Sequence, residues 1–189
     1  KINSEYEFYT TNYQNYSFLN NPDNVLFEES YYNQWLFRPE IRTTFVMNEN
    51  KLTTGIGLNF ETLNRTYFAE KAMLKSQFVF FQYDYNPNYK WNILAGLRYD
   101  NTNQYQSQFS PKLAVNFKIN TRLSLKTSIG YGFKAPDFRQ LYFDFLNSSV
   151  GYAVLGYNVA ESELNLLEGQ GQLLYRIPGI SFENPLKPE

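Results

Sequence analysis

The sequence contains no cysteine and no histidine. Their absence excludes thiolate nucleophiles, Ser-His-Asp triads, zinc sites of the Cys or His type, and histidine ligation of haem within this chain. Long apolar runs are also missing: the longest, Phe78 to Phe81, has about four residues, whereas a membrane-spanning helix needs roughly 18 or more. Charge is sparse and balanced, with a net charge of −1, so the composition gives no reason to expect nucleic acid as a partner.

Aromatic side chains are what the sequence has in excess. Tyr and Phe occur 17 times each, and aromatic residues make up 19% of the chain, the same share as all charged residues. The mean hydropathy is nevertheless −0.50, because Asn, Gln, Ser and Thr supply the polarity. So many large rings exclude an intrinsically disordered chain and are unusual in a soluble domain.

Apolar and polar residues alternate with a period of two over long stretches, which is the pattern of a strand with two different faces. The segments that show it are Tyr6–Phe18, Trp35–Met47, Leu52–Glu61, Met73–Tyr85, Trp91–Asp100, Lys112–Asn120 and Leu123–Phe133. Most span about 9 to 13 residues, whereas soluble strands cluster near 5 or 6 and a membrane-crossing strand needs about 9 to 11. The sequence therefore predicts an all-β fold, an antiparallel meander of about seven long strands.

The connectors between these segments alternate in length. Short connectors rich in Asn and Pro are typical of tight turns, and we expect them at Asn48–Asn50, Asn86–Asn88 and Asn120–Thr121. The long connectors are Leu19–Glu29, Thr62–Ala72, Asn101–Ser107 and everything after Pro136. Strict alternation places all the long loops at one end of the sheet, as in outer-membrane barrels. One face of each strand carries aliphatic residues bracketed by aromatic ones, as a lipid-facing band needs, and the other face is polar, as a lumen needs.

Two alternatives remain open at this point. A soluble antiparallel sandwich, which could bind carbohydrate through its aromatic residues, explains the alternation equally well but neither the strand lengths nor the aromatic girdles. A count of about seven strands also raises a closure problem, because bacterial barrels have an even number from about eight upward and an open edge in lipid leaves backbone groups unpaired. Either the sequence is a segment of a larger barrel, or the count is short by one strand.

Two motifs follow the last predicted strand. Residues 129–145 read Ile-Gly-Tyr-Gly-Phe-Lys-Ala-Pro-Asp-Phe-Arg-Gln-Leu-Tyr-Phe-Asp-Phe, and residues 184–189 read Asn-Pro-Leu-Lys-Pro-Glu. They resemble two landmarks late in the barrel of TonB-dependent outer-membrane receptors, Gly-Phe-Arg/Lys-Ala-Pro with a following Leu-Tyr pair, and Asn-Pro-x-Leu-Lys-Pro-Glu. The matching residues are Gly132, Phe133, Lys134, Ala135, Pro136, Leu141 and Tyr142, and then Asn184, Pro185, Leu186, Lys187, Pro188 and Glu189. The second motif lacks one residue after its first proline, and Gln108 to Lys112 is similar to the family's Phe-Ser-Pro-Lys/Arg strand start.

The resemblance implies that residues 1–189 are part of a transmembrane β-barrel of about 22 strands, with strands to about residue 135 and a long, partly helical extracellular loop over 136–189. It further implies an outer-membrane receptor of a Gram-negative bacterium for energy-coupled uptake of a siderophore, corrinoid or similar scarce nutrient. The implied partners are outer-membrane lipid, a plug domain of the same full-length chain, the TonB complex and the nutrient. No cofactor and no enzymatic activity are expected. The alternative is a smaller outer-membrane barrel for adhesion or passive diffusion. Haem receptors of the family carry a histidine between the two motifs, so haem uptake is disfavoured.

Ligand-binding residues are expected on the loops, where function on a rigid scaffold concentrates. The candidates are Arg139, Tyr142, Asp144, Tyr152 and Tyr157, together with Arg65 and Tyr67 in an earlier loop. Tyrosine combines a flat ring with one hydroxyl, which suits rigid amphipathic ligands such as metal chelates or corrinoids. For each residue the alternative is simple packing of loop against loop. Calcium at the loop carboxylates Asp144, Glu161 and Glu163 is conceivable, but such a site needs about 6 to 8 oxygens and no loop signature is present, so no metal site is assigned.

Two short helices are expected within the long loop. Phe138, Leu141, Tyr142 and Phe145 fall at helical spacing, with Asp137 as the N-cap. A second helix is expected from Ser162, as its cap, to about Tyr175. We expect this loop to fold over the barrel mouth.

Overall fold

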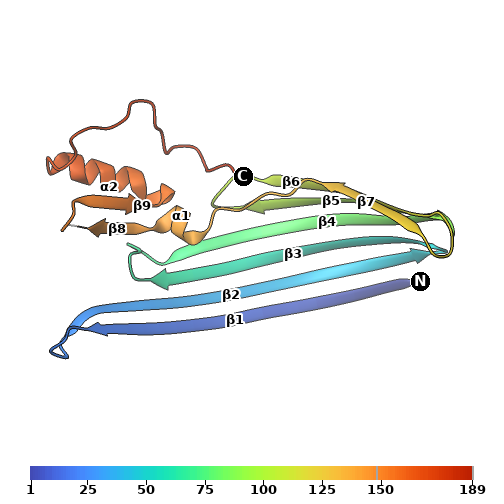
Figure 1. Cartoon of the computed structure of the whole chain (residues 1–189), viewed down its shortest axis with the longest axis horizontal. Coiled ribbons are helices and arrows are strands. Elements are labelled where there is room, and N and C mark those ends of the chain that lie inside the picture. The colour runs from blue at the N-terminus through green and yellow to red at the C-terminus, as the bar shows by residue number, and fades with distance from the viewer. Residues whose placement is uncertain (148, 189) are drawn as a thin grey trace.

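Seven strands form the one large sheet of this protein. The computed structural model describes residues 1–147 and 149–188, and Figure 1 shows the strands side by side in chain order. Their bounds are β1 Ile2–Asn20, β2 Leu26–Met47, β3 Asn50–Arg65, β4 Ala72–Asn88, β5 Trp91–Thr102, β6 Gln108–Lys118 and β7 Ser124–Gly130. Each strand is antiparallel to the next. The predicted meander of about seven long strands is confirmed.

The first strands are longer than predicted. β1 and β2 contain 19 and 22 residues, which at about 3.3 Å per residue exceeds the roughly 30 Å of a hydrocarbon core even with strong tilt. The predicted connector Leu19–Glu29 is therefore wrong for most of its length, because pairing continues through Phe18 and Glu29 and the turn is confined to residues 21–25. Asn21 closes this turn, since its side-chain oxygen accepts hydrogen bonds from the amides of Asp23 and Val25 at 3.1 and 2.9 Å.

The connections lie at two opposite ends of the sheet (Figure 1). We call one the loop end, with residues 21–25, 66–71, 103–107, 131–147 and 149–188, and the other the turn end, with residues 48–49, 89–90 and 119–123. The turn at residues 48–49 lies where the sequence predicts it, and the predicted connectors Thr62–Ala72 and Asn101–Ser107 are shorter than expected. The turn predicted at Asn120–Thr121 is longer than expected. The alternation of short and long connectors is thus weaker than predicted.

The turn predicted at Asn86–Asn88 is wrong. These residues belong to β4, and the turn follows at residues 89–90. The strand absorbs the Asn-Pro sequence as a local irregularity, because the register with β5 shifts between Tyr85 and Asn88. The amide of Asn86 donates to the Asn50 side chain at 2.8 Å, which anchors the irregular segment to β3.

β7 ends at Gly130 instead of the predicted Phe133. Its partner β6 carries Pro111 at the position where the ladder stops, and the last bond runs from the Tyr131 amide to the Pro111 carbonyl at 2.9 Å. Proline has no amide hydrogen to return the bond. The strand predicted to run into the Gly-Phe-Lys-Ala-Pro motif therefore stops before it.

The register gives the sheet an apolar face and a polar face. One row of the apolar face joins Ile2, Phe45, Leu52, Tyr83, Ala95, Leu113 and Ile129. One row of the polar face joins Glu5, Arg42, Gly55, Phe80, Arg98 and Ser110. Leu113, Leu125 and Ile129 are 45%, 61% and 75% exposed. Within residues 1–147 and 149–188 no second layer covers the apolar face, which excludes the sandwich for this part of the chain.

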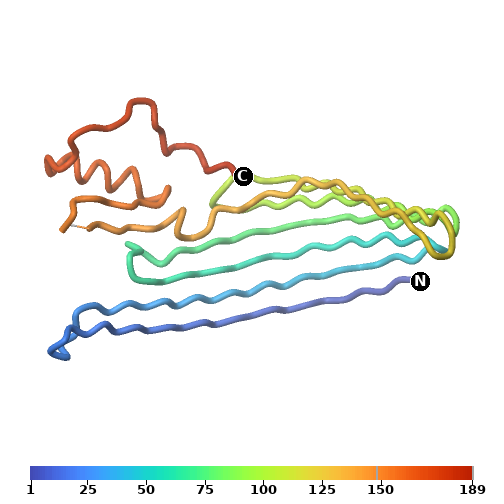
Figure 2. The backbone as a smooth tube through the Cα atoms, in the orientation of Figure 1, coloured from blue at the N-terminus to red at the C-terminus, as the bar shows by residue number. Residues whose placement is uncertain are grey.

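The chain after β7 folds into two helices and a hairpin at the loop end (Figure 2). These elements are α1 Phe138–Tyr142, β8 Asp144–Asn147, β9 Tyr152–Leu155 and α2 Tyr157–Gly169. The predicted N-cap of α1 is confirmed: the Asp137 carboxylate accepts from the Gln140 amide at 2.7 Å, and the Gln140 side chain accepts from the Asp137 amide at 2.9 Å. Phe145, predicted in this helix, lies in β8 instead, because Phe143 leaves the helix to form a β-bridge with Phe68.

The second helix begins five residues earlier than the sequence predicts, at Tyr157, and ends at Gly169 instead of Tyr175. Ser162 is therefore inside the helix and not its cap. Gly156 decides the start, because a Cβ there would lie 2.5 to 2.6 Å from backbone atoms of residues 141–143. Only glycine permits this close approach, and the Gly156 amide donates to the Phe143 carbonyl at 2.6 Å. In the described part of the chain no helix has the length and apolar character needed to cross a membrane.

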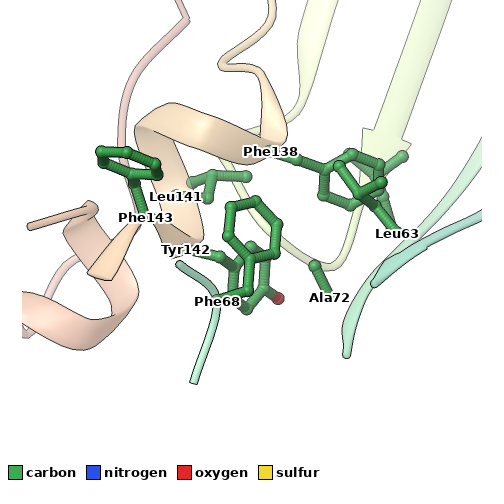
Figure 3. Close-up of a cluster of buried hydrophobic side chains, with 8 residues drawn as sticks. Leu63, Phe68, Ala72, Phe138, Leu141, Tyr142 and Phe143 are labelled. Atoms are coloured by element: carbon green, nitrogen blue, oxygen red, sulfur yellow. The ribbon is translucent and has the colours of Figure 1, made fainter. Parts of the chain in front are cut away.

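The chain after β7, residues 131–147 and 149–188, is called the loop segment. The main buried cluster joins this loop segment to the polar face of the sheet. Figure 3 shows α1 with Leu141 and Tyr142 beside Phe68, and Phe138 next to Leu63. Leu63 and Ala72 are paired across β3 and β4 and share the face of Glu40 and Phe78. Leu141 is fully buried. α1 thus covers the polar face at the loop end.

Candidate functional site at the loop end

Phe143 is the residue around which the loop end is organised. It is buried and forms an antiparallel β-bridge with Phe68. The guanidinium carbon of Arg139 lies 4.7 Å from the centroid of its ring, and that of Arg65 lies 5.9 Å away. Cations are attracted to aromatic faces at such distances. Two of the predicted ligand residues therefore meet on one ring, although they come from distant parts of the chain.

Arg65 is held by further contacts. Its guanidinium carbon lies 5.7 Å from the ring centroids of both Tyr32 and Phe68, and its Nε donates to the Thr66 carbonyl at 3.3 Å. It forms no salt bridge with any residue that the structure describes. Arg65 therefore packs β2, the β3–β4 loop and the loop segment together.

Tyr67 connects three separate elements. Its hydroxyl donates to Glu28 of β2 at 2.7 Å, its carbonyl accepts from the Asp144 amide of β8 at 2.7 Å, and its ring packs edge-on to Phe145 at 4.9 Å. The hydrogen bond to Glu28 is the main cause that raises the pKa of Tyr67, with burial and the Glu28 charge adding to it. The residue has a φ of 67°, a conformation that is uncommon for a non-glycine residue and often marks functional sites.

Tyr142 is buried beside a network of polar side chains. It is 8% exposed, and burial raises its pKa, as does the charge of Glu70, whereas hydrogen bonds from Asn158 and Gln104 oppose the rise. The Asn158 side chain donates to the Gln104 oxygen at 2.7 Å, and Gln104 donates to the Met73 carbonyl at 3.0 Å. The network links α1, α2 and the β5–β6 loop. Tyr142 therefore packs the loop end together instead of facing solvent.

The remaining candidates lie farther out. Tyr152 is 48% exposed and its ring centroid lies 5.9 Å from that of Phe145. Tyr157 is apart from the other candidates, with its hydroxyl donating to the Asn184 carbonyl and its ring 5.3 Å from Phe182. The structure thus brings Arg65, Tyr67, Arg139, Tyr142 and Asp144 together, with Tyr152 at the edge. Their role in ligand binding stays a prediction.

The two sequence motifs meet in space. Lys134, Ala135 and Pro136 of the first line a hollow of about 120 Å³ together with Leu186 and Lys187 of the second. Leu186 also forms a parallel β-bridge with Tyr105 and packs against the buried cluster. Glu189 lies outside the described residues. The motifs therefore help to hold the chain after β7 to the sheet.

A cluster of charged and aromatic side chains on the polar face was missed by the sequence reasoning. Glu40 is 9% exposed. Its carboxylate accepts a hydrogen bond from Arg42 at 2.6 Å and forms a longer salt bridge with Arg38 at 3.6 Å. Arg98 pairs with Asp100 at 2.7 Å. The signal was present as charged residues two positions apart, Arg38/Glu40/Arg42 and Arg98/Asp100, but only the register shows that both groups lie on one face beside Phe78.

Phe78 lies within this cluster. The guanidinium carbons of Arg38 and Arg98 lie 5.3 and 3.9 Å from the centroid of its ring. The cluster borders a hollow of about 640 Å³. The basic residues of this region, Arg38, Arg42, Arg98 and Lys112, are matched in number by the acidic residues Glu5, Glu7, Glu40 and Asp100. The region therefore has little net charge with which to attract an ion. Among the described residues no group of three acidic side chains could hold a metal ion.

An open sheet of long antiparallel strands, uncovered on its apolar face and covered by an ordered loop at one end of its polar face, is a segment of β-barrel wall. The chain belongs to the family described as TonB dependent receptor-like, beta-barrel, whose sequence model matches residues 1–189. The resemblance seen in the two motifs is thereby confirmed.

Comparison with known proteins adds one solved structure. No curated protein matches the sequence. The chain is similar to the crystal structure of the siderophore receptor PirA from Pseudomonas aeruginosa, with a TM-score of 0.55 and 19% identity. The match covers 71% of this chain and 30% of that receptor. At this level of identity the likeness shows the fold alone.

Proposed function

We propose that this chain is part of an outer-membrane receptor of a Gram-negative bacterium that imports a scarce small-molecule nutrient with energy supplied through the TonB complex. Membership of the receptor-barrel family over the whole chain supports this. The observation that carries the proposal is the position of the loop segment: α1 is buried on the polar face, while large side chains of the apolar face are bare. Lipid contact on one face and an ordered loop over the other are what such a receptor needs.

The polar face fits a covering plug domain of the full-length chain. In the cluster around Phe78, Glu40 is paired with Arg38 and Arg42, and Arg98 is paired with Asp100. A wall with little net charge can lie against a second protein surface without leaving unpaired buried charge. The TonB complex would act through parts of the full-length protein beyond this chain.

A siderophore is the first candidate nutrient, because the similar solved structure is that of a siderophore receptor. A corrinoid is the second, since exposed tyrosine and arginine suit both kinds of rigid ligand. The exposed candidates, Arg139 and Tyr152, are better placed for direct contact than the buried Tyr142.

The test is growth of a strain in which the full-length gene is deleted. Siderophores are supplied one at a time as the sole iron source, and corrinoids as the sole cobalamin source. We expect growth to fail on one compound and to return with the wild-type gene, and we expect uptake of that compound by the complemented cells to stop when the proton gradient is collapsed. Uptake that persists without the gradient, or no growth defect on any compound, would instead support a smaller barrel for passive diffusion or adhesion.

Substitutions then test the loop-end site. Arg139→Ala and Tyr152→Ala should each raise the half-saturating concentration of the compound so identified by roughly tenfold, which corresponds to about 1.4 kcal/mol. Tyr175→Ala is the matched control, since Tyr175 is 71% exposed on the same loop segment but belongs to no part of the site. Equal effects of all three substitutions would refute the assignment of Arg139 and Tyr152 to ligand binding.

A further inference from the structure

The turn end carries a concentration of positive charge that the receptor function does not explain. Lys90, Lys118, Arg122 and Lys126 line one hollow of about 760 Å³. Its lining contains no acidic residue, and none of the four cations forms a salt bridge within the described part of the chain. A cleft lined by charge of one sign focuses the electrostatic field and attracts counter-ions.

Acidic residues close to this hollow do not neutralise it. Asp84 accepts hydrogen bonds from the side-chain amides of Asn86 and Asn92, which are neutral, so it keeps its negative charge. Glu49 lines an adjoining hollow of about 720 Å³, which it shares with Lys90 and Lys118. Two carboxylates, Asp84 and Glu49, therefore stand against four cations, which leaves an excess of positive charge at this end.

The direction of the side chains narrows the choice of partner. Asn116 is paired with Lys126, and Lys118 with Ser124, across β6 and β7. These residues alternate with Phe117 and Leu125 of the apolar face, so both lysines lie on the polar face. Lys90 and Arg122 lie in the turns themselves, at the end of the sheet opposite the loop segment (Figure 1). A partner must therefore reach the cluster from the aqueous side of the wall, and a lipid headgroup beside the apolar face is disfavoured.

Asn116 supplies a second, independent observation. It borders both hollows, and its side-chain oxygen is buried without a hydrogen-bond partner among the described residues. Buried polar atoms in native proteins are nearly always paired, so an orphaned acceptor calls for an explanation. A partner that shifts the side chains over this oxygen and brings an N–H group to it would provide one.

We propose that this turn-end basic cluster binds an acidic peptide segment of a partner protein in the periplasm. Neighbouring strands lie about 4.8 Å apart, so cations on β6 and β7 can meet the carboxylates of one extended segment, while a backbone N–H of that segment serves Asn116. The inference rests on the proposed function only for its orientation, which places short turns on the periplasmic side.

The test uses the purified full-length receptor in detergent and a fluorescein-labelled hexaglutamate peptide as the probe. We expect hexaglutamate to bind at low ionic strength, a hexaglutamine peptide not to bind, and added salt to weaken binding because it screens exposed charges. The double variant Lys118→Gln/Lys126→Gln should weaken binding by about tenfold and reduce its salt dependence, because exposed charges of an interface steer association. Lys71→Gln/Lys75→Gln at the loop end is the matched control and should leave binding unchanged. Heat-dependent migration on gels checks that each variant is folded.

Three outcomes would overturn the proposal. The first is equal binding of hexaglutamate by the wild type and the turn-end double variant. The second is binding that occurs only after the domain inside the barrel is removed, which would make that domain the occupant. The third is lysine-dependent binding of phosphatidylglycerol vesicles without binding of hexaglutamate. A receptor that imports no nutrient but binds hexaglutamate through Lys118 and Lys126 would refute the proposed function alone.

Discussion

The ring of Phe80 lies over Gly55, so close that a Cβ on residue 55 would stand 2.5 Å from two of its ring atoms. Phe78 has the same relation to Gly57, where the distance would be 2.3 Å. Glycine weakens a strand, and an aromatic ring from the neighbouring strand can cover the gap it leaves. These pairs help to fix the register of β3 and β4, because a shift by one residue would move both rings to the apolar face.

Gly57→Ala should therefore destabilise the barrel. The added methyl group meets the Phe78 ring, which Arg38 and Arg98 hold from their own strands, and forced displacement in a packed site costs about 1 to 3 kcal/mol. Denaturant unfolding of the full-length receptor in detergent measures the change. Gly132→Ala is the control, since no atom lies within 4 Å of the added Cβ. Equal stability of both variants would show that the ring is free to move.

Glu40→Gln should destabilise the same region by a different mechanism. The substitution removes the carboxylate that Arg42 and Arg38 share. Breaking a buried ion pair costs about 3 to 5 kcal/mol, but both arginines are nearly half exposed, so we expect about 1 to 3 kcal/mol in the same unfolding measurement. Glu7→Gln is the matched control. Glu7 is exposed and directly opposite Glu40, so loss of its charge should leave stability unchanged or slightly raise it. A loss of stability in both variants would contradict this account.

Gly156→Ala should detach α2 from α1. Here the added Cβ meets backbone atoms of Leu141, Tyr142 and Phe143, which cannot rotate away as a side chain can. We expect faster hydrogen exchange in residues 138–160 and unchanged exchange in β3 to β6. Gly169→Ala is the control, because the new Cβ has open space around it. It should leave hydrogen exchange in the loop segment unchanged. Unchanged exchange in Gly156→Ala would mean that the contact between the helices is not tight in solution.

The meander and its two faces were predictable because they depend on a local property, the period of two. The alternation of Leu123, Leu125 and Ile129 identifies a strand without knowledge of its neighbours. The ends of the strands were not predictable in the same way. β1 and β2 extend into the expected connector because each pairs with the other. β7 stops early because Pro111 lies in its partner strand β6.

The loop segment also has one feature that local sequence predicts and one that it does not. Asp137 could be predicted as a helix cap because the capping box lies within four residues of sequence. The start of α2 could not, because Gly156 is selected by its contact with the backbone of α1. The polar-face cluster likewise needs the register of four strands before Arg38, Glu40 and Arg98 become neighbours of Phe78.

Tyr142 should make the loop end sensitive to alkaline pH. Burial raises its pKa above the ordinary value, so folding favours the neutral phenol. The stabilisation is fully present below about pH 10, the ordinary pKa of tyrosine, and is lost as the pH rises through the raised value in the folded protein. The phenolate absorbance of the wild type minus that of Tyr142→Phe, followed with pH, isolates this one hydroxyl and should have its midpoint above about 10. Near-ultraviolet circular dichroism should change over the same range in the wild type and less in Tyr142→Phe. A midpoint at or below the ordinary value would mean that Tyr142 is open to water, and that α1 does not cover the polar face in solution.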